Sequence, residues 1–166
     1  YDAAGRCTSI TGTDGTHVAL VLDGAGRVLR RTVTAPDGTV DVESFGIDEL
    51  GQLLRHVTAT GSTEWVRDAA GRVVAEIDGT GATRRFEFDS RGLLAAATDA
   101  AGLTTTYGYD AAGRIREQVA PGDRVTTWSH DALGMVARYT DPAGVTTSVD
   151  RDPTGIITSL ARGGHG

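Results

Sequence analysis

Apolar residues in this chain come in short runs, separated by clusters of Gly, Asp, Pro and Thr. Within the runs apolar and polar positions often alternate, as in Phe86-Glu87-Phe88, which is the two-residue period of a half-exposed β-strand. No segment carries a 3.6-residue apolar period long enough for an ordinary helix. The stretch 93–97 (LLAAA) is ambiguous alone, but it occupies a position where the rest of the chain predicts strand.

The turn signals between the runs recur as an internal repeat anchored on Asp-x-x-Gly. Successive anchor aspartates are separated by 21, 25, 20, 21, 21, 21 and 21 residues, so the repeat extends along the whole chain. The eight anchors are Asp2-Gly5, Asp23-Gly26, Asp48-Gly51, Asp68-Gly71, Asp89-Gly92, Asp110-Gly113, Asp131-Gly134 and Asp152-Gly155. Asp can accept hydrogen bonds from the backbone of a turn, and Gly supplies a positive φ.

A second turn signal lies about ten residues after most anchor glycines, which makes each repeat a strand, a turn, a strand and a turn. Examples are Asp14-Gly15, Asp37-Gly38 and Asp99-Ala100-Ala101-Gly102. We therefore predict an all-β fold of tandem ~21-residue β-hairpins, a single repeat array over residues 1–166. Because twisted open sheets rarely exceed about ten strands without curling, this long antiparallel sheet should be curved.

Apolar and aromatic residues recur at fixed positions relative to the anchor aspartates. The position three residues before the anchor carries an aromatic residue in five repeats: Phe45, Trp65, Phe86, Tyr107 and Trp128. The position one residue before it carries further aromatic residues, including Tyr1, Phe88 and Tyr109, and the spacing of two places both columns on one strand face. The position five residues after the anchor is apolar throughout. We expect these columns to form ladders across the sheet, with a solvated opposite face.

Charge and cysteine content restrict the classes of function. The net charge is −6 and the pI is about 5.1, so nucleic acid, which requires clustered basic residues, is not an expected partner. No run approaches the ~18 apolar residues of a membrane helix, so we expect no membrane insertion by this segment. Cys7 is the single cysteine, which excludes an internal disulfide, and it belongs to an apolar column.

The strongest copies of the repeat resemble a known motif. Tyr1-Asp2-Ala3-Ala4-Gly5-Arg6 and Tyr109-Asp110-Ala111-Ala112-Gly113-Arg114-Ile115 match Tyr-Asp-x-x-Gly-Arg-hydrophobic, the YD repeat of the rearrangement-hotspot (RHS) family. Other copies are degenerate, with Arg67, His130 and Arg151 in place of the tyrosine. The family includes bacterial polymorphic toxins, the B and C subunits of insecticidal toxin complexes, and teneurins.

The resemblance implies a hollow spiral β-shell that encloses a toxin or effector domain of the same parent protein. It implies a noncatalytic scaffold, secreted or at the cell surface, whose partners are the enclosed domain and neighbouring shell repeats. This chain would form part of such a shell, as a fragment of a larger protein. A carbohydrate-binding or adhesive module that uses the aromatic columns, with surface glycans as partners, is the alternative.

Few residues suggest chemistry, and each has a simpler structural interpretation. Arginines after four anchor glycines (Arg6, Arg27, Arg72 and Arg114) could bind a ligand, but we expect them to pair with turn carboxylates. Ser129-His130-Asp131 cannot form a catalytic relay, because consecutive strand residues point to opposite faces. The histidines, including His165, lack the spacing of metal ligands.

Asp152-Pro153-Thr154-Gly155-Ile156 is the nearest match to a self-cleavage motif of related toxins, but it is in register with the anchors and good turn chemistry. We predict no catalytic residue, metal site or cofactor, and a frayed end at residues 162–166.

Overall fold

The computed structural model describes residues 1–163 and contains only strands and turns within them. The strands are β1 (Ser9–Thr11), β2 (His17–Leu22), β3 (Val28–Thr34), β4 (Val40–Ile47), β5 (Leu53–Thr58), β6 (Gly61–Arg67), β7 (Val73–Asp78), β8 (Thr83–Phe88), β9 (Leu94–Thr98), β10 (Thr104–Tyr109), β11 (Ile115–Ala120), β12 (Arg124–His130), β13 (Val136–Thr140), β14 (Thr146–Arg151) and β15 (Ile157–Gly163). The all-β prediction is confirmed.

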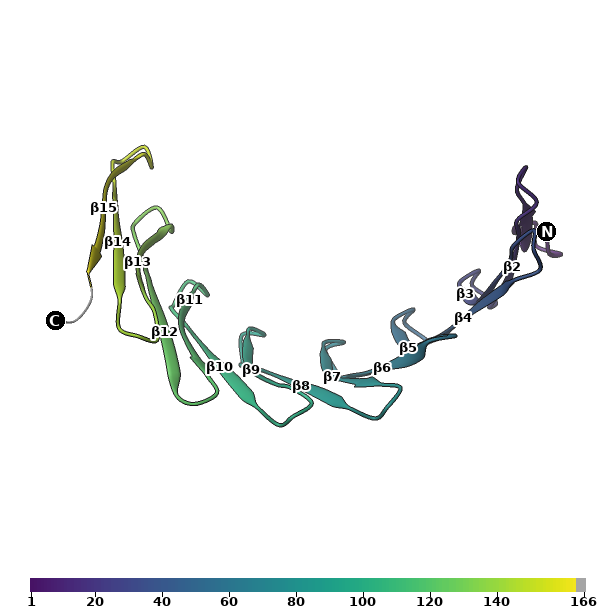
Figure 1. Cartoon of the computed structure of the whole chain (residues 1–166), viewed down its shortest axis with the longest axis horizontal. Helices are drawn as coiled ribbons and strands as arrows, with labels where there is room; N and C mark the ends of the chain where they lie inside the picture. Colours follow the sequence, from purple (N-terminus) through teal and green to yellow (C-terminus); the bar gives the residue numbers. More distant parts are fainter. Residues whose placement is uncertain (164–166) are drawn as a thin grey trace. The chain divides into compact units, whose positions relative to one another are not determined.

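Strands that are consecutive in the sequence are hydrogen-bonded to each other, in one unclosed antiparallel sheet with β1 and β15 at its edges (Figure 1). The chain divides into two compact units, Tyr1–Arg84 and Arg85–Gly166. Strands β1 to β7 lie in the first unit and β9 to β15 in the second, while the unit boundary falls within β8. Residues 94–97 of the stretch that was ambiguous in the sequence belong to β9, as their position in the repeat predicted.

The anchor turns share one hydrogen-bonding pattern. In the turn at Asp110, the Gly113 N–H donates to the Asp110 carbonyl at 3.1 Å, and the Asp110 N–H donates to the Arg114 carbonyl at 2.9 Å. This is a three-residue hairpin loop that requires a left-handed residue at its end, and Gly113 has φ +79°. The return turns at Asp78, Asp99 and Asp141 repeat the same pattern at the other ends of the strands.

Each hairpin that crosses an anchor turn also contains a β-bulge. The residue one position before the anchor pairs with the apolar residue five positions after it, as in Tyr109 with Ile115, but the next pair is Gly108 with Glu117. Arg116 therefore has no residue directly opposite it on β10. The same residue is skipped in the other hairpins, at Leu29, Leu54, Val74, Ala95, Ala137 and Thr158. Bulges bend a strand and increase its twist, and the spacing of the repeat in the sequence does not indicate them.

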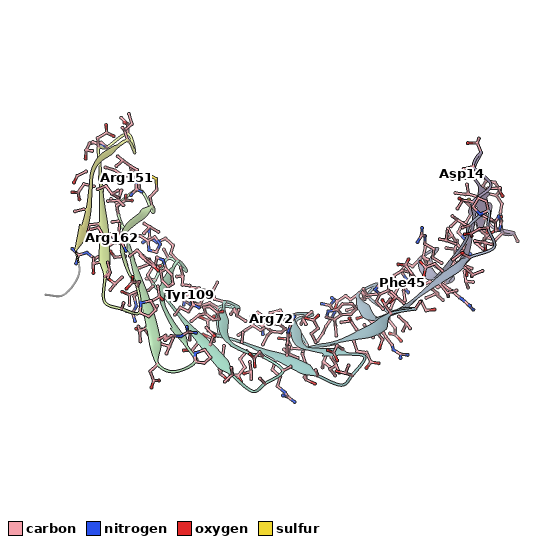
Figure 2. The ribbon with its side chains drawn as sticks, viewed as in Figure 1. Asp14, Phe45, Arg72, Tyr109, Arg151 and Arg162 are labelled. Atoms are coloured by element: carbon pink, nitrogen blue, oxygen red, sulfur yellow. The ribbon has the colours of Figure 1, made fainter. Side chains whose placement is uncertain are left out.

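The sheet is a single layer, so burial is slight everywhere. Ala96, at 9% exposure, is the most buried apolar residue among residues 1–163, and the large apolar side chains of the columns all remain partly or largely exposed. Figure 2 shows side chains projecting from both faces of the strands in each unit, without a second layer of backbone over either face. Stability must therefore come from contacts between neighbouring strands and turns.

One expectation about the end of the chain is wrong within the described residues. Arg162 and Gly163 are not frayed, because they belong to β15 and pair with Thr147 and Thr146 of β14. Residues 164–166, including His165, lie outside the described part of the chain.

Candidate functional site

The anchor turns form the most regular set of polar groups in the molecule, at one end of every second strand. All eight anchor aspartates are half-buried: Asp2, Asp23, Asp48, Asp68, Asp89, Asp110, Asp131 and Asp152. In the turn at Asp110, Oδ1 accepts the backbone N–H groups of Ala112 and Arg114, each at 2.9 Å. The carboxylate thereby satisfies backbone donors inside its own loop, as Asx turns do.

The second carboxylate oxygen binds the arginine that follows the anchor glycine. Nε of the arginine donates to Oδ2 of its own anchor at 2.7 Å in Arg6 and Arg114 and at 2.6 Å in Arg27, and Arg72 binds Asp68 in the same way. Because these pairs are partly exposed, the charge attraction alone stabilises each turn only slightly. Their main effect is to fix the direction of the guanidinium group.

Hydrogen bonds lower the pKa of several anchor carboxyls, including those of Asp2, Asp23, Asp68 and Asp110. In Asp2, Asp23 and Asp110 the pKa lies below its ordinary 3.8, chiefly because the backbone N–H four residues further on donates to the charged form. In Asp68 the largest cause of the lowered pKa is the hydrogen bond from Arg72. These carboxyls are therefore ionised at neutral pH, so they act as hydrogen-bond acceptors and not as proton donors.

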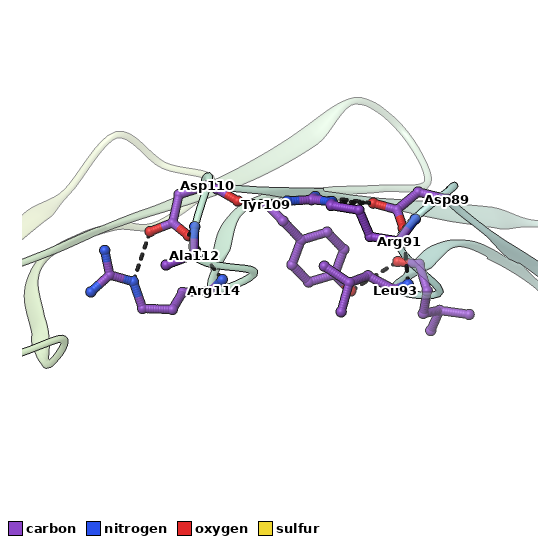
Figure 3. A network of polar contacts seen from close by, with 8 residues as sticks. Asp89, Arg91, Leu93, Tyr109, Asp110, Ala112 and Arg114 are labelled. Atoms are coloured by element: carbon purple, nitrogen blue, oxygen red, sulfur yellow. Dashed lines mark hydrogen bonds and ion pairs between the residues drawn. The ribbon is translucent and has the colours of Figure 1, made fainter.

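Several arginines also tie one anchor turn to the next. Nη1 of Arg6 donates to the Asp23 carbonyl at 2.8 Å, and Nη1 of Arg27 donates to the Asp48 carbonyl at 3.0 Å. In the fifth repeat the position after the glycine is Leu93, and Arg91 takes over: its Nη1 donates to the Asp110 carbonyl at 2.8 Å (Figure 3). We call this contact the turn tether.

A second kind of contact explains the column that precedes the anchors. The Tyr109 hydroxyl donates at 2.8 Å to the carbonyl of Leu94, in the preceding repeat. Arg67 donates to the equivalent Leu53 carbonyl at 3.1 Å, and Arg151 to the equivalent Val136 carbonyl at 2.7 Å. These carbonyls belong to the residue beside the bulge. We call this contact the bulge tether; it shows that arginine in place of the motif tyrosine keeps the same hydrogen bond.

The anchor glycines have a packing role as well as a conformational one. A Cβ on Gly113 would lie 3.5 Å from Leu93 Cδ1, and one on Gly155 would lie 3.0 Å from Met135 Cε. Gly71 is approached in the same way by Gln52. Each of these anchor glycines is therefore in contact with the side chain that follows the anchor glycine of the preceding repeat, most tightly at Gly71 and Gly155.

The five aromatic residues of the ladder occupy equivalent strand positions but pair with different residues. Phe45 lies opposite His56 and stacks on it, with ring centroids 4.9 Å apart. Trp128 lies opposite Tyr139, with centroids 5.9 Å apart. Trp65, Phe86 and Tyr107 lie opposite Glu76, Ala97 and Gln118. Since a complete strand separates successive ladder members, the ring contacts join neighbouring strands.

The residues that suggested other chemistry are dispersed or engaged. His130 is 8% exposed, and its Nδ1 lies 3.9 Å from Oδ2 of Asp110 rather than near Ser129 or Asp131. Asp152 Oδ1 accepts the N–H groups of Thr154 and Ile156, as an anchor does. Cys7 is half-buried and donates to the Ser9 carbonyl.

Residues 1–163 hold neither a metal-binding cluster nor a membrane-spanning helix. No group of three or more His, Cys, Asp or Glu side chains within residues 1–163 is arranged to hold a metal ion. No helix among them is long and apolar enough to cross a membrane.

The repeat geometry has a counterpart in a known sequence family. The profile described as RHS Repeat matches residues 1–40, 48–83, 88–122 and 109–147, which together cover most of the chain. The chain belongs to the RHS repeat family. The turn tethers and bulge tethers therefore describe how neighbouring RHS repeats of this chain are joined. No curated protein sequence matches it.

Solved structures share the fold of this RHS chain at low sequence identity. The crystal structure of TcdB2-TccC3 without its hypervariable C-terminal region matches with a TM-score of 0.78 and 19% identity over 97% of this chain. TcdB2-TccC3 itself and the Tc holotoxin pore of Photorhabdus luminescens each match with a TM-score of 0.76 and 19% identity, again over 97% of the chain. In each comparison this chain spans 10% of the other chain.

Proposed function

We propose that this chain is a noncatalytic wall segment of an RHS shell, which encloses or presents an effector domain of the same parent protein. The proposal rests on the hydrogen bonds of the polar side chains along the anchor turns, which stabilise the turns and join neighbouring repeats. The anchor carboxylates bind their own loops, and the arginines and Tyr109 bind the neighbouring repeat. Groups committed to joining repeats in this way suit a wall better than a reaction centre.

Enclosure of a domain is the finer part of the proposal. It is supported by the family of the repeats and by the similarity of the fold to TcdB2-TccC3, a protein described as having a hypervariable C-terminal region. A single-layer sheet leaves one face available to a lumen and the other to the outside. By analogy with that family, the parent protein would be secreted or displayed at the cell surface.

Limited proteolysis of the parent protein tests enclosure directly. In the wild-type protein the enclosed domain should resist a protease concentration that degrades the same domain when it is expressed alone. Removing both tethers between the fifth and sixth repeats, with Arg91→Ala and Tyr109→Phe, should open the wall and increase cleavage of the domain. Glu87→Ala, an exposed strand residue, is the matched control. A domain that is cleaved equally fast in the wild-type parent and alone would contradict enclosure.

One observation favours the carbohydrate-binding alternative. Tyr139, at 37% exposure, and Trp128 form a tilted aromatic pair, and exposed aromatic faces are able to stack on sugars. A glycan array probed with this chain would support that function if binding were lost in Trp128→Ala or Trp65→Ala. If no glycan on the array binds, the carbohydrate-binding alternative is wrong, and the aromatic columns serve only to stabilise the wall.

A further inference from the structure

The hairpins of the second unit meet at three boundaries, which we call seams: β9–β10, β11–β12 and β13–β14. At one end of each seam two successive anchor turns are neighbours, and at the other end a return turn joins the two strands. Backbone pairing is similar at all three seams, with Cα partners in register along each of them. Side-chain contacts at the two ends therefore decide which seam is held least firmly.

The anchor-turn ends of the two outer seams are tethered. Both kinds of tether are present at the β9–β10 seam, where Arg91 and Tyr109 each donate to a carbonyl across the seam at 2.8 Å (Figure 3). At the β13–β14 seam Arg151 forms the bulge tether at 2.7 Å and also binds Oδ2 of Asp131 at 3.2 Å. At least one long side chain with a terminal donor thus crosses each outer seam.

The anchor-turn end of the β11–β12 seam has neither tether within residues 1–163. Arg114 follows its anchor glycine as Arg6 does, but its Nη atoms donate to no carbonyl of the seventh turn. His130 takes the position of Tyr109, and its shorter ring forms no hydrogen bond, since Nδ1 lies 3.9 Å from Oδ2 of Asp110. A pocket of about 220 Å³ remains beside the His130 ring.

The return turns differ in the same way. At the two outer seams a carboxylate, of Asp99 or Asp141, accepts two backbone N–H groups of the turn. Two threonine hydroxyls lie across each of these seams beside the turn, 2.9 and 3.0 Å apart. The return turn of the β11–β12 seam, residues 121–123, is flanked instead by Ala120 and Arg124.

The β11–β12 return turn also has a strained backbone. Asp123 has φ +55° and is the one non-glycine residue with a positive φ in the described part of the chain. The left-handed conformation is unfavourable for a residue with a Cβ, although less so for aspartate than for most. The side-chain contact of this turn is a hydrogen bond from Arg124 Nε to the Pro121 carbonyl at 3.2 Å. This turn is therefore held less firmly than the return turns on either side.

We propose that the β11–β12 seam is a built-in opening point, at which the second unit separates locally before it unfolds as a whole. The backbone pairs of β11 and β12 keep the seam closed in the ground state. Local opening requires less free energy where fewer side-chain contacts have to be broken, and this seam lacks those of its neighbours at both ends. The proposal follows from the contacts of this chain alone and does not depend on the shell function.

Native-state hydrogen exchange followed by NMR tests the opening point. In a low concentration of urea, the amides that bond across the β11–β12 seam should exchange about tenfold faster, or more, than those that bond across the β9–β10 seam. Equal exchange across the two seams, or slower exchange across β11–β12, would overturn the proposal.

Two reciprocal substitutions form a matched pair. His130→Tyr places the longer side chain in the pocket, where its hydroxyl should reach the Ile115 carbonyl and slow exchange across β11–β12 about fivefold. Tyr109→His removes the bulge tether of the β9–β10 seam and should speed exchange there by a similar factor, with β11–β12 unchanged. Substitutions that change both seams equally would contradict the proposal. If His130→Tyr does not fold, the wild-type comparison and Tyr109→His still decide the question.

Discussion

At the scale of single residues, three of the residues that precede an anchor aspartate share a hydrogen bond rather than an aromatic ring. Tyr109, Arg67 and Arg151 reach the same carbonyl of the preceding repeat with different side chains. Tyrosine and arginine are both long side chains with a terminal donor, so they are interchangeable here. The degenerate copies at Arg67 and Arg151 therefore preserve the contact between repeats, whereas His130 lies beside Asp110 instead.

Tyr109→Phe tests the bulge tether. The substitution removes one hydroxyl and leaves the Leu94 carbonyl without its side-chain donor, so the free energy of unfolding should fall by about 1 kcal/mol. Urea unfolding followed by circular dichroism measures the change. Tyr107→Phe is the matched control, expected to have little effect. Tyr109→Arg should retain most of the stability, and a loss larger than that of Tyr109→Phe would contradict the equivalence of the two side chains.

Arg27→Lys tests the need for a guanidinium group in the turn tether. Arg27 binds Oδ2 of Asp23 through Nε and the Asp48 carbonyl through Nη1, two directions that a single ammonium group cannot serve equally. We expect Arg27→Lys to lose about 0.5–1.5 kcal/mol, close to the loss in Arg27→Ala. Arg30→Lys, on an exposed strand position, should be nearly neutral in the same urea experiment. A neutral Arg27→Lys would show that charge alone suffices.

At the scale of elements, the hairpins were predictable and their internal irregularities were not. Asp-x-x-Gly spacing placed the turns because Asp and Gly act locally, within four residues. The bulge depends on which residues lie opposite each other, as Gly108 and Glu117 do across β10 and β11, and a single strand carries no such information. The bulge tether was missed for the same reason, since Tyr109 and Leu94 are joined only once the strands pair.

Some signals were present in the sequence but were not used. Asp78-Gly79-Thr80-Gly81 is itself an Asp-x-x-Gly turn, and the structure gives it the hydrogen bonds of an anchor. Arginine recurs with tyrosine in the column before the anchors, and their shared donor character could have indicated a common acceptor. The ladder residues Phe45 and Trp65 do not face each other directly, because β5 lies between their strands.

Gly113→Ala tests the two requirements at an anchor glycine. The φ of +79° is unfavourable for a residue with a Cβ, and the new methyl group would contact Leu93. The expected loss is about 1–2 kcal/mol in the free energy of unfolding, measured by urea titration. Gly108→Ala, in β10 without a positive φ, is the control and should be neutral or slightly stabilising. Equal effects at the two positions would contradict the conformational argument.

At the scale of the whole molecule, stability is distributed along the turns rather than concentrated in a core. Ala96 is the one buried apolar residue in the described part of the chain, so the usual apolar contribution is small at any single position. All sixteen basic residues that could pair with carboxylates are arginine. The repeated Asp–Arg contacts make the molecule sensitive to conditions that change the charge of aspartate.

Acidification should therefore weaken the whole array at once. The carboxyls of Asp2, Asp23 and Asp110 have a lower pKa in the folded chain than their ordinary 3.8, so the unfolded chain binds more protons as the pH falls. Their stabilising contribution is fully present above the unfolded value and is lost as the pH falls through the folded value. We expect a constant urea midpoint from pH 7 to about pH 5 and a steep decline below about pH 4.

A variant identifies which groups cause this decline. Asp110→Asn retains a turn acceptor but cannot ionise, so its midpoint should be lower at pH 7 and should fall less on acidification. Glu87→Gln, at an exposed strand position, should follow the wild-type curve. A wild-type midpoint that is unchanged down to pH 3 would contradict the role of the anchors.

The order of strands in the sheet has a consequence for biosynthesis. Because each strand pairs only with its neighbours in the sequence, no segment must wait for a distant one before it can be placed. Short loops between partners favour rapid closure. Each hairpin can pair with the preceding one as it leaves the ribosome. At the growing end of the sheet, only the last strand to be synthesised then has an unpaired edge.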